Sequence, residues 1–254
     1  MIDHLRTCGV IPESFGHDSS EEKLYSKYTD AVISEGLSFV GLRSAVIDAR
    51  ADVADVQATC REFSLVADAK AFRLSRTAKN QKDFKVQALD GWRGTLDFAL
   101  LVCPIYHLPS RRSQIYRQAI SRNVCIISYS HLASLVVLAE RRGPGLGKKA
   151  LQAILNVVTI LHPTSSALDY WMGINRMLAA ELSEDSDIWT AEKTASLDSL
   201  GLAKQEALAV LTAERDRLLS LSHQEALREL LSMAGIENRI ATVRQVEHGN
   251  LLGA

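Results

Sequence analysis

The sequence lacks the cysteine and histidine patterns that mark disulfide-rich or zinc-binding proteins. Its four cysteines, at positions 8, 60, 103 and 125, stand far apart in the 254-residue chain with no paired spacing. The seven histidines are scattered, and no Cys/His group has the spacing of a zinc site. We therefore expect buried, reduced thiols and a cytoplasmic location.

Long hydrophobic runs and an export signal are also missing. The apolar runs end well before the length of about 18 residues that a membrane span requires, and no basic segment precedes a long apolar stretch at the N-terminus. The sequence thus predicts an unexported protein with no membrane partner. With 47% hydrophobic residues, the chain can bury the core of one large domain, with or without a helical appendage.

An excess of one charge is absent from the whole chain but present locally. The formal net charge is -1, yet the stretch from Lys70 to Arg93 contains seven cationic side chains and only two anionic ones, Asp83 and Asp90. Contacts with phosphates supply most of the sequence-independent affinity for nucleic acid, so a local basic stripe matters more than the total. Cations recur at every third position of this stripe: Lys70, Arg73, Arg76, Lys79, Lys82 and Lys85.

An Asp-x-Lys pair opens the basic stripe. Asp68 and Lys70 follow the apolar residues 65–67, which predict a strand, and side chains two positions apart project from the same face of a strand. A carboxylate and an ammonium group would therefore meet one ligand. Two simpler interpretations compete, because such a pair is often a solvated strand end with a weak ion pair, and a charge ladder is often a solvated face.

Residues 65–89 closely resemble the centre of the HindIII-type restriction endonucleases. The resemblance extends through residues 9–13 and 21–27, and more faintly through residues 113–116 and the helical C-terminus. It implies membership of the PD-(D/E)XK nuclease superfamily, in which two acidic residues and a lysine gather at the edge of a small mixed sheet. The implied activity is that of a type II restriction endonuclease acting on double-stranded DNA.

The resemblance places the catalytic residues at Asp55, Asp68 and Lys70, with the two carboxylates as Mg²⁺ ligands. Mg²⁺ prefers oxygen ligands, lowers the pKa of bound water and neutralises charge on a phosphate. Ala54 stands where the superfamily motif has proline, and the connection between the two aspartates is shorter than the family pattern. Asp48 takes the place of an upstream catalytic glutamate, and the neighbouring Asp52 is an alternative for that role.

The roles of the two lysines that flank the stripe stay open at this point. Lys70 can orient the attacking water, deprotonate it, or stabilise the transition state electrostatically. Lys85 can assist the same phosphate as a further catalytic residue or only hold the DNA backbone.

A DNA-binding role is expected for the remainder of the stripe. Asparagine can pair with adenine in the major groove, which makes Asn80 a candidate for base reading. Alternatively, residues 77, 80 and 83 only cap and solvate a short helix. The residues expected to contact DNA are Arg73, Arg76, Lys79, Asn80, Lys82 and Lys85.

The resemblance further implies cleavage of a short palindrome that leaves 5′-phosphate ends, with AAGCTT as the site if the resemblance is complete. A two-fold symmetric site suits a homodimer, and host DNA would need protection by a companion DNA methyltransferase. Two alternatives remain: a structure-directed or repair nuclease on the same core, and a catalytically inactive, sequence-specific DNA-binding protein.

The predicted fold class is α/β, with a mixed central sheet flanked by helices and a helical C-terminal region. We expect a catalytic core with an N-terminal helical segment at 1–142, a flexible loop at 143–149, and helices in 150–254 packed on the core. The loop is glycine-rich, but no Ser or Thr follows its Gly-Lys and no strand precedes it, so it does not match a phosphate-binding loop. The expected elements are a helix at 20–39, a hairpin carrying Asp55 and Asp68, a strand at 97–103, a helix at 113–122, a parallel strand at 124–128, and helices at 131–140, 168–182, 197–221 and 222–233.

Overall fold

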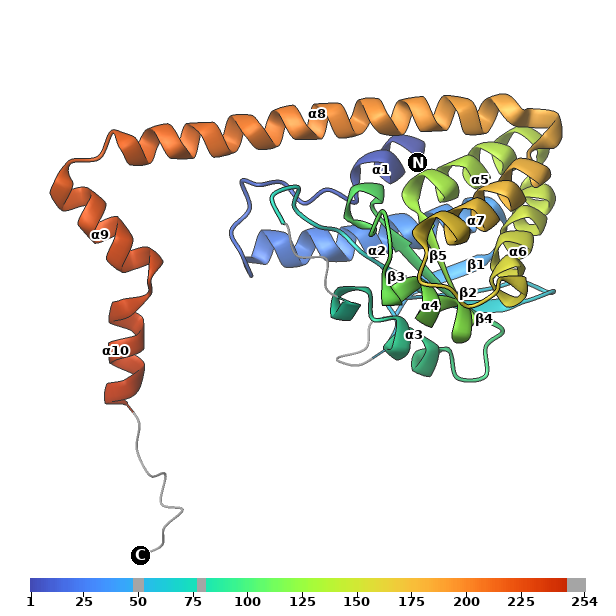
Figure 1. Cartoon of the computed structure of the whole chain (residues 1–254), viewed down its shortest axis with the longest axis horizontal. Helices are drawn as coiled ribbons and strands as arrows, with labels where there is room; N and C mark the ends of the chain where they lie inside the picture. Colours follow the sequence, from blue (N-terminus) through green and yellow to red (C-terminus); the bar gives the residue numbers. More distant parts are fainter. Residues whose placement is uncertain (48–52, 77–80, 246–254) are drawn as a thin grey trace, which may run out of the picture. The chain divides into compact units, whose positions relative to one another are not determined.

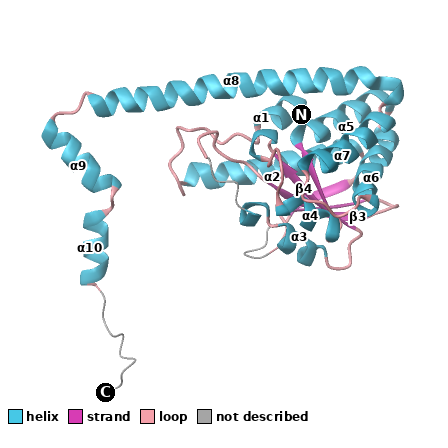
Figure 2. Ribbon diagram, in the orientation of Figure 1, coloured by secondary structure: helices cyan, strands magenta, loops and turns pink. Residues whose placement is uncertain are grey.

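A five-stranded mixed sheet forms the centre of residues 1–207 (Figure 2). The structure is a computed structural model and describes residues 1–47, 53–76 and 81–245. The strands lie in the order in which they occur in the chain, with the first three antiparallel and the last three parallel. They are β1 (Arg43–Val46), β2 (Val56–Thr59), β3 (Ser64–Ala69), β4 (Phe98–Cys103) and β5 (Val124–Ser128). The predicted α/β class with a mixed sheet is confirmed.

The hairpin of β2 and β3 brings together two segments that the sequence singled out. Its tight turn is closed by the Cys60 N–H, which donates to the Phe63 carbonyl at 2.8 Å. The antiparallel register pairs Val56 with Ala67. Asp55, which precedes Val56, therefore lies next to Asp68, which follows Ala67.

Two crossover helices build the parallel half of the sheet. Helix α3 (Val86–Arg93) connects β3 to β4, and α4 (Gln114–Ser121) connects β4 to β5. Parallel strands covered on both faces are apolar throughout, and all five residues of β5 are indeed buried. The predicted strand, helix and parallel strand are confirmed.

Helices cover both faces of the sheet (Figure 1). Helices α1 (Ile2–Thr7), α2 (Ser20–Val40) and α5 (Tyr129–Arg142) lie on one face, whereas α3 and α4 lie on the other. The long α2 begins where the Ser19 hydroxyl accepts a hydrogen bond from the Glu22 N–H, as expected from its sequence. It ends at Gly41, whose φ of 108° is a conformation that favours glycine. Three short 3-10 helices, η1 (Gln81–Phe84), η2 (Ile105–His107) and η3 (Ser183–Asp185), complete the described turns.

The expectation of a flexible loop at 143–149 is wrong. Helix α6 (Pro144–Ile160) begins within it, with proline at the start of a helix, where no N–H is needed. A Cβ atom on Gly147 would lie 2.7 Å from the Cβ of Ala139, so this glycine allows α6 to pack closely on α5. Gly147 thus reflects close helix packing, which cannot be distinguished from a loop by composition alone.

The chain divides into two compact units, Met1–Ala207 and Leu208–Ala254. The first unit includes α6, α7 (Ala167–Glu181) and the first part of α8 (Ser186–Leu219), which we expected in the C-terminal region. In this unit, the Tyr170 hydroxyl donates to the Ile126 carbonyl and accepts from the Ile126 N–H. A side chain thereby satisfies the backbone N–H and carbonyl of Ile126 at the open edge of β5.

The described part of the second unit is helical. It consists of the end of α8, then α9 (His223–Met233) and α10 (Ile236–Arg244). The predicted helix at 222–233 is confirmed, and a capping box starts it, since Ser222 and Glu225 bond reciprocally at the start of α9. No residue of α9 or α10 is buried. Within the described ranges, no helix combines the length and apolar character needed to cross a membrane.

Candidate active site

Asp68 and Lys70 meet at the carboxyl end of β3. The Asp68 side chain is 1% exposed, and its Oδ2 forms an ion pair with the Lys70 Nζ. The backbone of Lys70 is fixed on both sides, because its N–H donates to the Val102 carbonyl at 2.9 Å and its carbonyl accepts from the Tyr129 hydroxyl at 2.8 Å. The catalytic lysine expected from the sequence is thus held rigidly on the parallel part of the sheet.

Asp55 joins this pair from the start of β2. Its backbone carbonyl accepts a hydrogen bond from the Ile47 N–H at 2.8 Å, which ties it to the end of β1. Burial raises the pKa of the Asp55 carboxyl, and the adjacent carboxyls of Asp68 and Asp30 raise it further. Lys70 acts in the opposite direction and favours the charged carboxylate.

A third carboxyl, that of Asp30 on α2, was not predicted from the sequence. Burial raises the pKa of Asp30 to about 6, and Asp68 adds to the shift, whereas Lys70, Lys27 and Lys85 oppose it. These influences place Asp30 within electrostatic range of the site. The available signal was an acidic residue set between Thr29 and Val32, which face the core.

Lys70 remains charged despite its burial. Burial alone would lower the pKa of this ammonium group, but the charges of Asp68 and Asp55 and the contact with Asp68 outweigh it, and the pKa is raised. In the chain as described, Lys70 is therefore a proton donor and a positive charge, which favours a role in positioning and charge stabilisation.

The donor set around Asp68 suits a hard divalent cation. Three carboxyls, those of Asp30, Asp55 and Asp68, influence one another electrostatically in a partly buried setting, and oxygen donors of this kind are preferred by Mg²⁺. Both oxygens of Asp68 are buried, and among the described residues neither accepts a hydrogen bond, the ion pair with Lys70 aside. A cation at this position would satisfy these oxygens and relieve the repulsion between the carboxyls.

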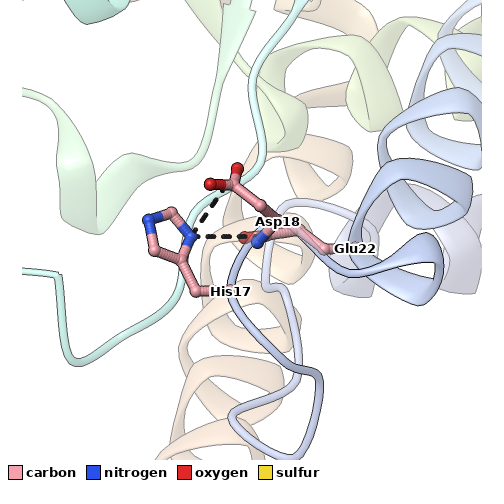
Figure 3. A group of neighbouring side chains, drawn as sticks. All are labelled: His17, Asp18 and Glu22. Atoms are coloured by element: carbon pink, nitrogen blue, oxygen red, sulfur yellow. Dashed lines mark hydrogen bonds and ion pairs between the residues drawn. The ribbon is translucent and has the colours of Figure 1, made fainter. Parts of the chain in front are cut away.

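A second group of potential ligands, His17, Asp18 and Glu22, lies at the start of α2 (Figure 3). Its ligand atoms lie within 4.8 Å of one another, a closer grouping than that of the three carboxyls around Asp68. However, Glu22 already contacts the Arg73 guanidinium at 2.9 Å and accepts from the Asp18 N–H at 2.7 Å. The positive end of a helix also disfavours a cation. The group is better explained as a cap of α2.

Two arginines of the basic stripe are engaged within the protein. Arg73, besides its ion pair with Glu22, donates to the carbonyls of Phe15 and Gly16. Arg76 contacts Asp83 at 2.7 Å and lies over the ring of Phe72. The side chain of Arg73 is 17% exposed and that of Arg76 is 42% exposed. Arg76 thus has more surface for DNA than Arg73, and a DNA contact stays a prediction for both.

Lys82 and Lys85 are both exposed near η1. Lys85 has a positive φ of 47° just before α3, and its ammonium group lies 5.4 Å from the centre of the Trp92 ring. The structure therefore brings Lys85 near Asp30 while leaving it open to solvent. Other expected site residues lie outside the described residues: Asp48, Asp52, Thr77, Lys79 and Asn80.

Gly9, in the N-terminal segment that shares the family resemblance, supports the chain segment that follows β3 directly. Gly9 accepts a hydrogen bond from the Phe72 N–H, two residues beyond Lys70, and the Tyr106 hydroxyl donates to the carbonyls of both residues. A Cβ on Gly9 would lie 2.8 Å from the ring of Tyr129, the residue that bonds the Lys70 carbonyl. Residues far apart in sequence thus fix the same short segment.

Comparison with known proteins agrees with this geometry. The sequence profile of the family described as HindIII restriction endonuclease matches residues 1–247. The chain belongs to the HindIII restriction endonuclease family. The chain is 45% identical over 140 residues to a curated relative, the type II restriction enzyme HindIII of Haemophilus influenzae. The match covers 54% of this chain and 47% of the relative, so it spans about half of the curated enzyme.

Proposed function

We propose that this member of the HindIII family is a type II restriction endonuclease that hydrolyses double-stranded DNA at a short palindrome with the help of Mg²⁺. The observation that carries the proposal is the buried Asp68, paired with Lys70 and adjacent to Asp55 at one end of the sheet. Perturbed carboxyls and a charged lysine gathered at one point are typical of a catalytic site.

Asp55 and Asp68 would hold the Mg²⁺ ion, with Asp30 as a third oxygen donor in the role for which we considered Asp48 and Asp52. When bound, this ion would lower the pKa of water and offset the negative charge of the phosphate. The three carboxyls come from β2, β3 and α2, so the packing of these elements sets their separation. The raised pKa values of Asp30 and Asp55 indicate that the charged forms of these two carboxyls need a compensating cation.

Lys70 would act on the phosphate and the attacking water through its Nζ. Since its pKa is raised, the ammonium donates hydrogen bonds and stabilises negative charge that develops on the phosphate oxygens. Water attacks phosphorus, the bond to the 3′ oxygen breaks, and that oxygen takes up a proton. The products are a 5′-phosphate and a 3′-hydroxyl. Lys85, exposed and near Asp30, would hold the neighbouring backbone.

Site recognition is proposed to follow the family, with AAGCTT as the first sequence to test. Residues 73–85 lie directly after the catalytic strand, so DNA held by them would present its backbone to Lys70. A palindrome needs one active site for each strand, which a homodimer with two-fold symmetry supplies. A companion methyltransferase would protect host DNA.

The dimer surface is proposed to lie on the second unit, with another copy of this chain as the partner. Leu227, Leu230 and Leu231 form an exposed apolar stripe at helical spacing on α9, and Met233 and Val243 are about 70% exposed. Such apolar surface favours association. Sedimentation of the wild-type chain and of Leu230→Glu tests this: we expect a dimer that the variant dissociates, and a wild-type monomer would refute it.

One cleavage assay distinguishes the proposed function from its alternatives. A long DNA of known sequence is incubated with the protein, with and without Mg²⁺. Discrete fragments with ends inside AAGCTT or another palindrome are expected only with Mg²⁺. A smear or junction-specific cutting would instead indicate a repair nuclease, and shifted but uncut DNA would indicate an inactive binding protein.

A further inference from the structure

One flank of helix α2 carries two lysines that the proposed active site does not yet use. Lys23, Lys27 and Asp30 lie at intervals of four and three residues, so they share one stripe of the helix, and Ser26 borders this stripe. Asp30 is the carboxyl within range of Asp68, which places the inner end of the stripe at the catalytic cluster. The stripe therefore leads from the catalytic cluster toward the N-terminus of α2.

A cavity of about 590 Å³ lies at the outer end of this stripe. Lys23 and Ser26 line it from α2, and Phe72 and Arg76 line it from the segment that follows the catalytic lysine. The cavity is therefore bounded by the two chain segments that flank Lys70 and Asp30. A DNA strand that passes over the catalytic cluster has a recess along which to continue.

The charges in the recess leave the two lysines free to bind an anion. The carboxylate of Glu22 is matched by Arg73 at 2.9 Å, and Asp18 lies at the rim, 3.9 Å from the imidazole of His17. Lys23 and Lys27 are exposed, and neither forms a salt bridge with a residue in the described part of the chain. Their ammonium groups are thus the cations of α2 available for phosphate.

We propose that Lys23, Ser26 and Lys27 bind the DNA backbone beside the scissile phosphate, as a second contact surface separate from residues 73–85. Two lysines one helical turn apart can meet successive phosphates of one strand. The Ser26 hydroxyl, which donates to the Glu22 carbonyl at 3.2 Å, would have to turn from that partner to donate to the phosphate between them. Lys27, the nearer of the two to Asp30, contacts the phosphate next to the cut. This proposal rests on the proposed nuclease function.

The test measures binding of a duplex containing AAGCTT as a function of salt. Lys23→Gln and Lys27→Gln are made in the Asp68→Asn background, so that the DNA stays intact. Each should reduce the slope of log K against log salt by about 0.9, because one phosphate contact is lost. Lys204→Gln, an exposed lysine of α8, is the matched control and should leave the slope unchanged. Slopes equal to that of the control would overturn the proposal.

A second measurement locates the contact. Duplexes that each carry one neutral methylphosphonate near the cut are bound by the protein with Lys27 and with Lys27→Gln. At the contacted phosphate, the losses of binding free energy caused by the methylphosphonate and by Lys27→Gln should not be additive, since each change removes the same interaction. Additivity at every position would overturn the assignment of Lys27. Failure here is distinct from failure of the proposed function, which is judged by whether the wild-type chain cuts mapped DNA.

Discussion

Two buried polar clusters lie at the carboxyl ends of parallel strands, and they differ in how well their groups are satisfied. At the end of β5, His131 Nδ1 accepts from the Ser128 N–H and bonds its hydroxyl at 2.6 Å, while Nε2 lies 2.8 Å from the Asn175 Oδ1. Burial lowers the pKa of His131 to about 4, so the ring stays neutral, flanked by Trp171 and Trp189.

The cluster at the end of β3 has the opposite character. Asp68, Asp55 and Asp30 are like charges near one another, with raised pKa values for the latter two. Apart from the ion pair with Lys70, the buried oxygens of Asp68 accept no hydrogen bond from a described residue. A native fold normally satisfies its buried polar groups, as it does around His131. This difference favours a structural role for the cluster at His131 and a ligand-binding role for the cluster at Asp68.

The strongest test of this difference is Asp68→Asn. We expect cleavage to fall roughly a thousandfold, because the loss of a metal ligand removes several kcal/mol of transition-state stabilisation. DNA binding should persist, since the basic surface is untouched; Asp68→Ala should behave in the same way. The measurement is the single-turnover cleavage rate with Mg²⁺, with His131→Gln as control. Cleavage near the wild-type rate in Asp68→Asn would remove Asp68 from the catalytic site.

The sequence predicted only part of the cluster at the end of β3, because its residues come from segments that differ in their separation along the chain. Asp68 and Lys70 share a strand, so a spacing of two was enough to bring them together. Asp55 was placed by resemblance, because a hairpin register cannot be read from composition. Asp30 was missed because it reaches the site from α2, through packing between elements far apart in the chain.

Local patterns also explain which parts of the fold were predicted. The helices predicted at 20–39 and 222–233 and the apolar runs of β4 and β5 depend on short-range signals, and the structure confirms these elements. The glycines of α6 were misread because Gly147 serves contact with Ala139, a long-range feature. Regular spacing in the basic stripe likewise did not predict equal exposure of its cations, since Arg73 pairs with Glu22 and is 17% exposed whereas Arg76 is 42% exposed.

The two clusters should drive the pH dependence of stability in opposite directions. The folded-state pKa of His131 is lowered, so its contribution is full above pH 6.5 and is lost as pH falls toward 4. The folded-state pKa of Asp30 is raised to about 6, so its unfavourable charging is relieved as pH falls through that value. The pH dependence of the wild-type free energy of unfolding between pH 7 and pH 5 is therefore the difference between these two effects.

Variants separate these effects in urea unfolding at pH 7 and pH 5. The stability advantage of the wild type over His131→Gln should shrink by about 2 kcal/mol from pH 7 to pH 5. For Asp30→Asn the change has the opposite sign: the stability of the wild type relative to this variant should rise from pH 7 to pH 5, because the wild-type Asp30 becomes protonated. A constant gap between the wild type and His131→Gln at both pH values would mean that the ring is not held neutral in the folded state.

Mg²⁺ should stabilise the protein through the carboxyl cluster alone. At a tenfold excess over its dissociation constant, the ion is expected to add about 1.4 kcal/mol to the free energy of unfolding. The shift should be larger at pH 8 than at pH 5.5, because protons compete with the metal for Asp30 and Asp55. Thermal unfolding with Mg²⁺ or a chelator measures it. An equal shift in Asp68→Asn would place the bound ion elsewhere.

The smallest expected effect belongs to an exposed charge outside both clusters, Lys82. Because it is exposed and forms no salt bridge with a described residue, Lys82→Gln should leave the free energy of unfolding unchanged within about 0.5 kcal/mol. Its loss should weaken DNA binding by about twofold to threefold and reduce the salt slope by about 0.9, since a single phosphate contact is removed. Fluorescence anisotropy over a range of salt concentrations, with Lys204→Gln as the reference, measures both quantities. A slope identical to the reference would remove Lys82 from the DNA surface and leave binding to the residues nearer the catalytic cluster.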